Sequence, residues 1–214
     1  MDVDFSYLED LLDSAMAAAR ADRGAVQVLV EPQHKLFLAA QTGFSPDFLA
    51  TFPPTDPSDQ STAIGRAASK RQPVLIEDVE REDGYGHRDD ARAARCRSVN
   101  ATPLISSKGN VLGVLLLFFK EPHQASTSTL RALDIYGHMA ATFIEAGRLK
   151  GAVIRADPGS ARRISDVELK AAIRRLRTHP HNSALVQQIY ALGDQYVHQM
   201  QAEFKRIEGH PARQ

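Results

Sequence analysis

The sequence predicts an α+β domain built on a central antiparallel sheet, followed by a two-helix C-terminal extension. Two observations carry this prediction. Pairs of short apolar segments are joined by hairpin turns, which makes them antiparallel neighbours in one sheet. Segments with apolar residues three and four positions apart begin and end the domain, and we expect these N- and C-terminal helices to cover one face of the sheet.

The composition is that of an ordinary globular protein. Of the 214 residues, 43% are hydrophobic and 24% are charged, and the formal net charge is zero. The longest apolar run, Val111–Phe119, is far shorter than the about 20 residues that span a bilayer. The N-terminal residues lack the layout of a signal peptide, and a single cysteine excludes an internal disulfide. We therefore expect a cytoplasmic protein with no membrane partner.

The first half of the chain supplies a helix and a hairpin. Apolar residues at helical spacing predict a helix over residues 5–21. Strands are expected over residues 25–30 and 36–42, joined by a turn at residues 31–34. Beyond them, Phe44, Phe48 and Phe52 lie at i, i+4 and i+8, which predicts a short helical turn with three aromatic rings on one side.

The middle of the chain is irregular, and the regular pattern returns after it. Ser61 is expected to cap a short helix that ends near residue 70. A strand follows over residues 73–79, and a polar stretch over residues 80–97 contains one short helix near residues 88–95. The last elements of the domain are two strands and a helix; we place them at residues 98–105, 111–119 and 126–150.

The C-terminal part predicts a linker and two unequal helices. Gly, Pro and Ser over residues 151–164 indicate the linker, and Ser165 with Glu168 fits a capping box at the start of a helix that ends at Thr178. Asn182 is expected to cap a longer helix, and residues 209–214 are expected to be disordered. The apolar stripe of this longer helix is long enough to require a partner, either the domain or a second copy of the chain. The stripe comprises Leu185, Ile189, Leu192, Tyr196, Met200, Phe204 and Ile207.

The charge of the extension is weakly basic. Residues 161–214 hold nine Lys and Arg against five Asp and Glu. Two helices give no third to complete a DNA-reading unit, so nucleic acid is not the expected partner. A phosphoacceptor helix is also disfavoured, because Gln199 follows His198 where an acidic residue is typical.

Five short stretches of the sequence together carry a resemblance to a known domain family. In order they are residues 36–44, ending in Ala-x-x-Gly-Phe; residues 61–67, a small-residue helix; residues 73–79, closing in Asp-Val; residues 97–104, ending in Pro-Leu; and residues 109–115, Gly-Asn-Val-Leu-Gly-Val-Leu. Their spacing is most similar to GAF domains of bacterial histidine kinases and related signalling proteins. The resemblance implies a GAF sensor domain over residues 1–150. The helical extension over residues 165–208 follows from the spacing of its apolar residues and is not part of the resemblance. No phosphate-binding loop or nucleophile elbow is present in the sequence, so we expect no enzymatic activity.

The resemblance also implies a small-molecule pocket between the sheet and the middle of the chain. Pockets are mostly apolar with a few polar groups that orient the ligand. Residues of both kinds are available, although the aromatic rings would serve equally well as core, His87 as a solvated loop residue and Asp78 as a turn residue. The candidate ligand-binding residues are Phe44, Phe48, Phe52, Asp78, Tyr85, His87, Cys96 and Thr102.

No cofactor is identified by the sequence. Bilin-binding GAF domains attach the chromophore through a cysteine followed by histidine, whereas Arg97 follows Cys96. Free methionine sulfoxide reductases of this fold use several cysteines. No histidine has a setting typical of haem, and His179 with His181 offers too few ligands for a metal. The neighbouring arginines could lower the pKa of the Cys96 thiol, which leaves a redox switch open beside an inert buried thiol.

The sequence therefore predicts a regulatory protein that binds a small molecule or a signalling protein and reports through its helices. We expect a homodimer formed by the terminal and tail helices. Two alternatives stay open, a scaffold that has lost ligand binding and a regulator that uses its basic tail. A cavity filled by the three phenylalanines would favour the scaffold.

Overall fold

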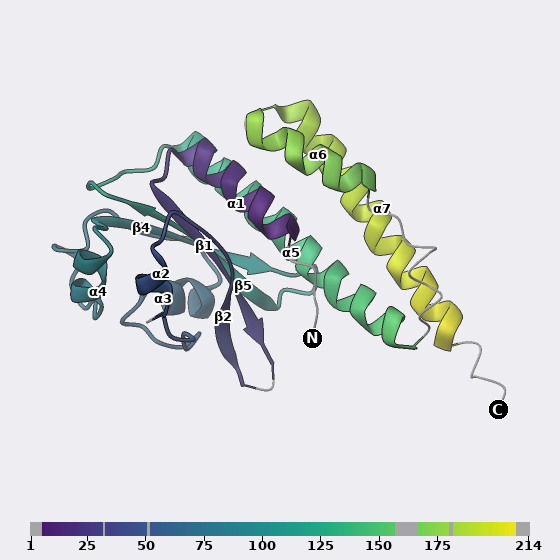
Figure 1. Ribbon diagram of the computed structural model, residues 1–214, viewed down its shortest axis with the longest axis horizontal. Helices are drawn as coiled ribbons and strands as arrows, with labels where there is room; N and C mark the ends of the chain where they lie inside the picture. Colours follow the sequence, from purple (N-terminus) through teal and green to yellow (C-terminus); the bar gives the residue numbers. More distant parts are fainter. Residues whose placement is uncertain (1–5, 32, 51, 157–166, 180–181, 209–214) are drawn as a thin grey trace.

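Residues 6–31, 33–50, 52–156, 167–179 and 182–208 are described by a computed structural model. The elements form layers (Figure 1). A five-stranded sheet lies in the centre, with helices α1 (Ser6–Ala19) and α5 (Thr127–Ala156) on one face. Helix α3 (Ala63–Lys70) and the shorter helices α2 (Pro46–Ala50) and α4 (Arg88–Ala93) lie on the other face. The predicted α+β class and the predicted position of the terminal helices are confirmed.

The sheet is antiparallel throughout, with strand order β2-β1-β5-β4-β3. The strands are β1 (Arg23–Val30), β2 (Lys35–Thr42), β3 (Val74–Ile76), β4 (Ser98–Ile105) and β5 (Val111–Phe119). Strands β4 and β5 have the bounds that the sequence predicts. Strand β3 is shorter than predicted, because pairing with β4 ends at Ile76 and the chain then turns at Asp78.

Two apolar cores form because successive side chains of a strand point to opposite faces. On β5, Leu115 and Leu117 pack under α1 and α5, whereas Val114 and Leu116 pack toward α3. The second core continues through Ile76 and Val99 on the neighbouring strands. Both faces of the central strands are therefore buried, which agrees with their nearly continuous apolar sequence.

Helix α3 begins one residue later than the sequence predicts. Its cap is Thr62, whose side-chain oxygen accepts a hydrogen bond from the Gly65 amide at 2.9 Å. Ser61, the predicted cap, instead donates its hydroxyl hydrogen to the Asp59 carboxylate at 2.6 Å. Both residue types cap helices well, so their order in the sequence does not decide between them.

Helix α5 is longer than predicted and continues to Ala156 through Gly151. The boundary between domain and linker at residue 151 is therefore wrong for residues 151–156. Glycine costs a helix only about 1 kcal/mol relative to alanine, which a long helix tolerates. The rest of the predicted linker, Ser165 of the capping box, Phe5 and residues 209–214 lie outside the described residues.

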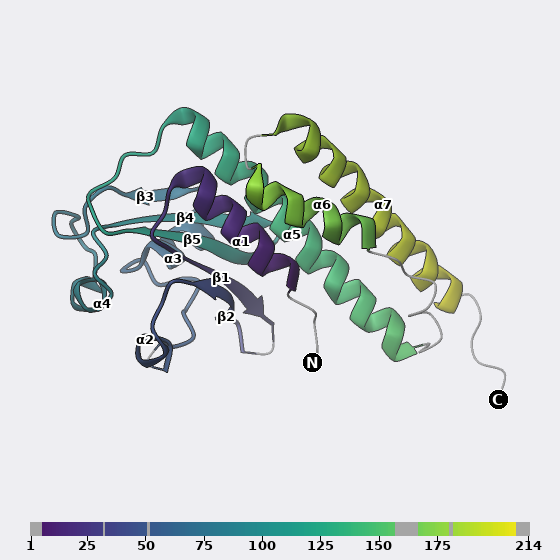
Figure 2. The same ribbon diagram turned by 45° about the horizontal axis from the view of Figure 1, so that its top comes forward.

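The two tail helices dock on the domain. Figures 1 and 2 place α6 (Val167–Thr178) and α7 (Ser183–Glu208) on the outer side of α1 and α5, with α6 against α1 and α7 against α5. Asn182 caps α7 as predicted and accepts a hydrogen bond from the Leu185 amide at 3.0 Å. On the predicted stripe Leu185, Ile189 and Tyr196 are buried.

The rest of that stripe is less fully described. Leu192 is half-buried, and the side chains of the last three stripe residues lie outside the described set. Within the described part of the chain, no helix is both long and apolar enough to serve as a membrane span.

Docking of the tail should appear as a matched difference between two positions of α6. Ile173 is fully buried in the helical core, whereas Val167 is 70% exposed. We expect Ile173→Ala to lower the free energy of unfolding by about 2–5 kcal/mol, because a buried isoleucine leaves a cavity. Val167→Ala should change it by less than about 0.5 kcal/mol. Chemical denaturation checks both values, and equal small effects would mean that α6 does not dock.

Candidate functional site

A cavity of about 310 Å³ lies between the sheet and the middle of the chain. The sheet forms its floor, where Val99, Leu116 and Phe118 line the cavity. The first turn of α3 forms one wall, and the segment from Tyr85 to Cys96 forms another. The remaining lining residues come from β2, α2 and the loop after α2: Lys35, Phe48, Phe52, Pro53, Pro54, Thr55, Asp56 and Asp59.

The three phenylalanines form an aromatic stack at this cavity. The rings of Phe44 and Phe48 stack with centroids 5.0 Å apart, and Phe48 is followed by Phe52 at 5.6 Å. Phe44 does not line the cavity; its ring packs edge-on against Phe118 at 5.2 Å and supports the other two. Phe48 and Phe52 line the cavity without filling it.

Five charged or titratable side chains surround the mouth. The Lys35 ammonium nitrogen lies 3.7 Å from the Asp56 carboxylate. The Nδ1 atom of His87 lies 2.8 Å from the Asp90 carboxylate. Asp59 forms no ion pair with a described residue, and its Oδ1 accepts two hydrogen bonds from Ser61, one from the hydroxyl and one from the amide. These bonds hold the pKa of the Asp59 carboxyl below its usual range.

Asp56 resembles Asp59 in its local geometry. Its Oδ1 accepts hydrogen bonds from the hydroxyl and the amide of Ser58, and these bonds lower its pKa. Neither carboxylate was among the site residues predicted from the sequence. The signal was the repeated pattern Asp-x-Ser over residues 56–61, since aspartate commonly bonds to the backbone two residues onward in turns.

The loop that carries Asp59 is fixed against α3 by a close backbone approach. A Cβ atom at Gly65 would lie 2.1 Å from the Asp59 carbonyl oxygen, so only glycine fits there. The same carbonyl accepts a hydrogen bond from the Thr62 hydroxyl at 3.1 Å. The position of the carboxylate at the mouth of the cavity therefore follows from the start of α3.

Tyr85 is a buried polar residue that lines the cavity. It is 9% exposed, and burial raises the pKa of its phenol to about 12. The hydroxyl is therefore neutral at physiological pH and can donate a hydrogen bond. Within the described residues it has no hydrogen-bond partner, although it lines the cavity.

Two of the predicted site residues lie elsewhere. Thr102 is on β4 but faces the helices: its methyl group lies against Gly137 of α5, and its hydroxyl donates to the Asn100 side chain at 3.0 Å. Its place in the predicted site is wrong because residues 100 and 102 alternate away from the cavity. Asp78 forms ion pairs outside the cavity, so its expected role as a turn residue agrees better with the structure.

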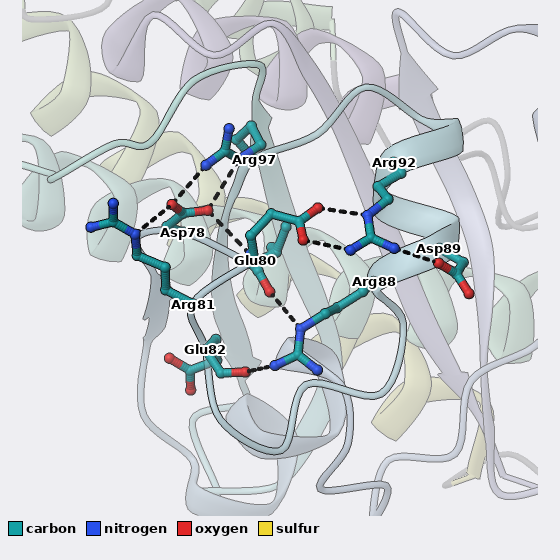
Figure 3. Close-up of polar contacts among 9 residues, drawn as sticks. Asp78, Glu80, Arg81, Glu82, Arg88, Asp89, Arg92 and Arg97 are labelled. Atoms are coloured by element: carbon teal, nitrogen blue, oxygen red, sulfur yellow. Dashed lines mark hydrogen bonds and ion pairs between the residues drawn. The ribbon is translucent and has the colours of Figure 1, made fainter.

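Arginine–carboxylate pairs brace the segment that walls the cavity (Figure 3). Arg97 at the start of β4 makes two hydrogen bonds to Asp78, at 2.7 and 3.1 Å. Arg92 on α4 makes two to Glu80, at 2.6 and 2.8 Å. Two-point pairing fixes orientation as well as distance. These pairs therefore tie residues 78–80 both to the sheet and to α4.

Cys96 is a buried thiol at the back of the cavity. It is 3% exposed, and its Sγ donates to the Ser98 carbonyl oxygen at 3.2 Å. Burial raises its pKa to about 11, so the thiol is protonated near neutral pH. Arg97 is held by Asp78. The expected lowering of the pKa by neighbouring arginines is therefore wrong, which disfavours a redox-sensing thiolate.

The described residues contain no cluster of three or more His, Cys, Asp or Glu side chains that could hold a metal ion. His87 is half-buried at the cavity mouth, and His179 is exposed at the end of α6. What the cavity offers is an apolar space with one neutral donor and several carboxylates.

The Asp78 pair should contribute stability only while the carboxyl is ionised. Hydrogen bonds from Arg97 hold its pKa below the usual value, so the contribution is complete above about pH 4 and is lost as the pH falls through the lowered pKa. We expect Asp78→Asn to unfold at a lower temperature than the parent at pH 7, with the difference disappearing at low pH.

The control for this prediction is Asp83→Asn. Asp83 is exposed in the same loop, and its carboxylate makes no ion pair among the described residues. Thermal unfolding followed from pH 2 to pH 8 compares the two variants. A difference that did not depend on pH would show that the ion pair does not stabilise the loop.

Cys96 should resist alkylation in the native protein. A raised pKa and burial both suppress the reactive thiolate, so iodoacetamide at pH 7.5 should react at least about a hundredfold more slowly than with the unfolded chain. Intact mass spectrometry follows the reaction, with denaturant as the control. Fast modification of the native protein would restore the redox-switch hypothesis.

The structure is similar to solved GAF domains at low sequence identity. A GAF domain/HD domain protein from Geobacter sulfurreducens matches with a TM-score of 0.58 and 19% identity, covering 69% of this chain and 95% of that one. The GAF domain of a phosphoenolpyruvate-protein phosphotransferase from Acinetobacter matches with a TM-score of 0.57 and 17% identity, covering 68% and 84%. These likenesses concern the fold.

The same fold occurs in an enzyme. Free methionine-R-sulfoxide reductase from Neisseria meningitidis, solved with its substrate, has a TM-score of 0.53 and 19% identity, with 69% of this chain and 81% of that one covered. No protein of curated function matches the sequence. The family model for the GAF domain matches residues 7–145, and it supports a signalling or regulatory role. The chain belongs to the GAF domain family.

Proposed function

We propose that this protein is a ligand-responsive regulator that binds a small molecule in the cavity between the sheet and α3, without a chemical step. The carrying observation is the cavity itself, which stays open at about 310 Å³ although three phenylalanines stand beside it. Ligand pockets range over about 300–1,000 Å³, so this space suits a small molecule. An open cavity also disfavours the scaffold hypothesis, which requires the aromatic rings to fill it.

The sheet supplies a direct path from the cavity to the helices. Val99 and Leu116 face the cavity, and their chain neighbours Asn100 and Leu115 face the helical layer. Helix α5 approaches β4 closely, since a Cβ atom at Gly137 would lie 3.0 Å from the Thr102 methyl group. A ligand that displaces these strands therefore acts on α5 through packed atoms.

The response to the ligand is then a change in how the tail helices α6 and α7 pack on α1 and α5. Helix α7 lies along α5, and α6 lies against α1. A shift of α5 therefore changes the surface on which the tail packs. A ligand changes this equilibrium only if it binds one packing more tightly than the other. The homodimer that we propose for the active form requires α6 and α7 to leave α1 and α5, or to be exchanged between copies, because the described apolar faces of the tail are used within the chain.

The tail offers less support for binding nucleic acid. Arg174 lies 3.6 Å from the Asp10 carboxylate of α1, so part of its positive charge is paired within the chain. Arg175 is exposed on the same helix. A signalling protein is the partner that we favour.

Native mass spectrometry of protein purified from its own host tests the proposal. A noncovalent adduct lost on denaturation would support a ligand sensor and give the ligand's mass. A clean mass, with no stabilisation by metabolites, would contradict ligand binding. The same spectrum reports whether the protein is a dimer.

A matched pair of substitutions on α4 assigns the adduct to the cavity. Ala91 is buried and lines the cavity, whereas Ala93 on the same helix is exposed. Ala91→Leu should occupy part of the cavity and remove the adduct, because the added side chain has an apolar space to enter. Ala93→Leu should keep it. If both variants retain the adduct, the ligand binds elsewhere.

A further inference from the structure

The charges around the cavity indicate which class of ligand it takes, and this inference rests on the proposed function. Three carboxylates, from Asp56, Asp59 and Asp90, line the cavity, against one lysine and one histidine. Lys35 lies beside Asp56, and His87 lies beside Asp90. Asp59 forms no ion pair within the described residues, although the nearby His87 imidazole helps to lower the pKa of its carboxyl.

The geometry of Asp59 leaves one oxygen for a ligand. Both hydrogen bonds from Ser61 end on Oδ1, at 2.6 and 2.9 Å. No described residue donates to Oδ2. The carboxylate is also fixed in place, because the Asp59 backbone is packed against Gly65. A held carboxylate with one free oxygen is suited to a charged donor.

Tyr85 gives a second and independent sign of a ligand. The residue is 9% exposed and lines the cavity, and its hydroxyl makes no hydrogen bond within the described residues. The hydroxyl oxygen does not belong to the fully buried atoms that lack a partner, so a molecule in the cavity can reach it. A ligand atom that accepts or donates a hydrogen bond would satisfy it.

We propose that the cavity binds a small organic cation, with an ammonium group at Asp59 and an apolar or aromatic body against Phe48, Phe52 and Phe118. The phenol of Tyr85 makes one further hydrogen bond to this ligand. The same carboxylates disfavour the binding of phosphate or carboxylate ligands, because like charges repel each other in a partly buried site.

Three probes of nearly equal shape test the charge preference on the full chain. They are 2-phenylethylamine, 2-phenylethanol and 3-phenylpropanoate, measured by titration calorimetry and thermal shift up to millimolar concentration. The amine should bind and raise the unfolding temperature, whereas the alcohol binds at least about tenfold more weakly and the acid not at all. Stronger binding of the acid or the alcohol, or no binding of the amine, overturns the inference.

Two variants assign the binding to named groups. Asp59→Asn keeps an oxygen that can accept from Ser61 but removes the charge, so amine affinity should fall at least about tenfold. Asp194→Asn, at an exposed position of α7 away from the cavity, is the matched control and should leave affinity unchanged. Tyr85→Phe should weaken the amine by roughly three- to tenfold. Unchanged affinity in Asp59→Asn overturns the assignment of the ammonium group to Asp59.

Failure of this inference differs from failure of the proposed function. If the acid or the alcohol binds and Ala91→Leu abolishes that binding, the cavity is a ligand site of another class and the proposed function stands. If no probe binds and the native mass carries no adduct, both are overturned.

Discussion

The alternation of side chains on β4 and β5 is the constraint on which the rest of the structure depends. Both strands are buried on both faces, so every residue must serve one of two cores. One core joins the sheet to α1, α5 and the docked tail, and the other joins it to α3 and the cavity. Shifting either strand by one residue would exchange the two sets of side chains. Hence the cavity and the helical layer are specified by the same segments of chain.

The cavity also depends on polar contacts that fix irregular backbone. The loop before α3 is held by turns at Asp56 and Asp59 and by the close approach at Gly65. The opposite wall is held by two ion pairs, Arg92 with Glu80 and Arg97 with Asp78. Arg23 of β1 adds a link, because its guanidinium donates to the carbonyl oxygens of Gly43 and Ala94. These polar contacts therefore fix the loops that form two walls of the cavity.

The sequence predicts the periodic parts of this molecule and much less of the site. The strands at residues 98–105 and 111–119 and the cap at Asn182 were predictable, because local periodicity and turn chemistry determine them. The aromatic stack was predictable from spacing. Asp59 and the position of Thr102 were not, since they depend on which face a strand presents and on where a loop meets α3. The Asp-x-Ser repeat indicates a turn at Asp59, but it does not indicate that this turn meets α3 and the cavity.

The docked tail adds a further layer of helices, α6 and α7, outside α1 and α5. In the layered arrangement of Figure 2, α5 lies between the sheet and α7. Helix α5 is continuous from Thr127 to Ala156, so the part that contacts β4 and the part that contacts α7 belong to one element. The packing of α7 lies along this same helix. The proposal that the tail reports the state of the cavity therefore depends on the contact between α5 and α7, because the same helix α5 approaches Thr102 of the sheet at Gly137.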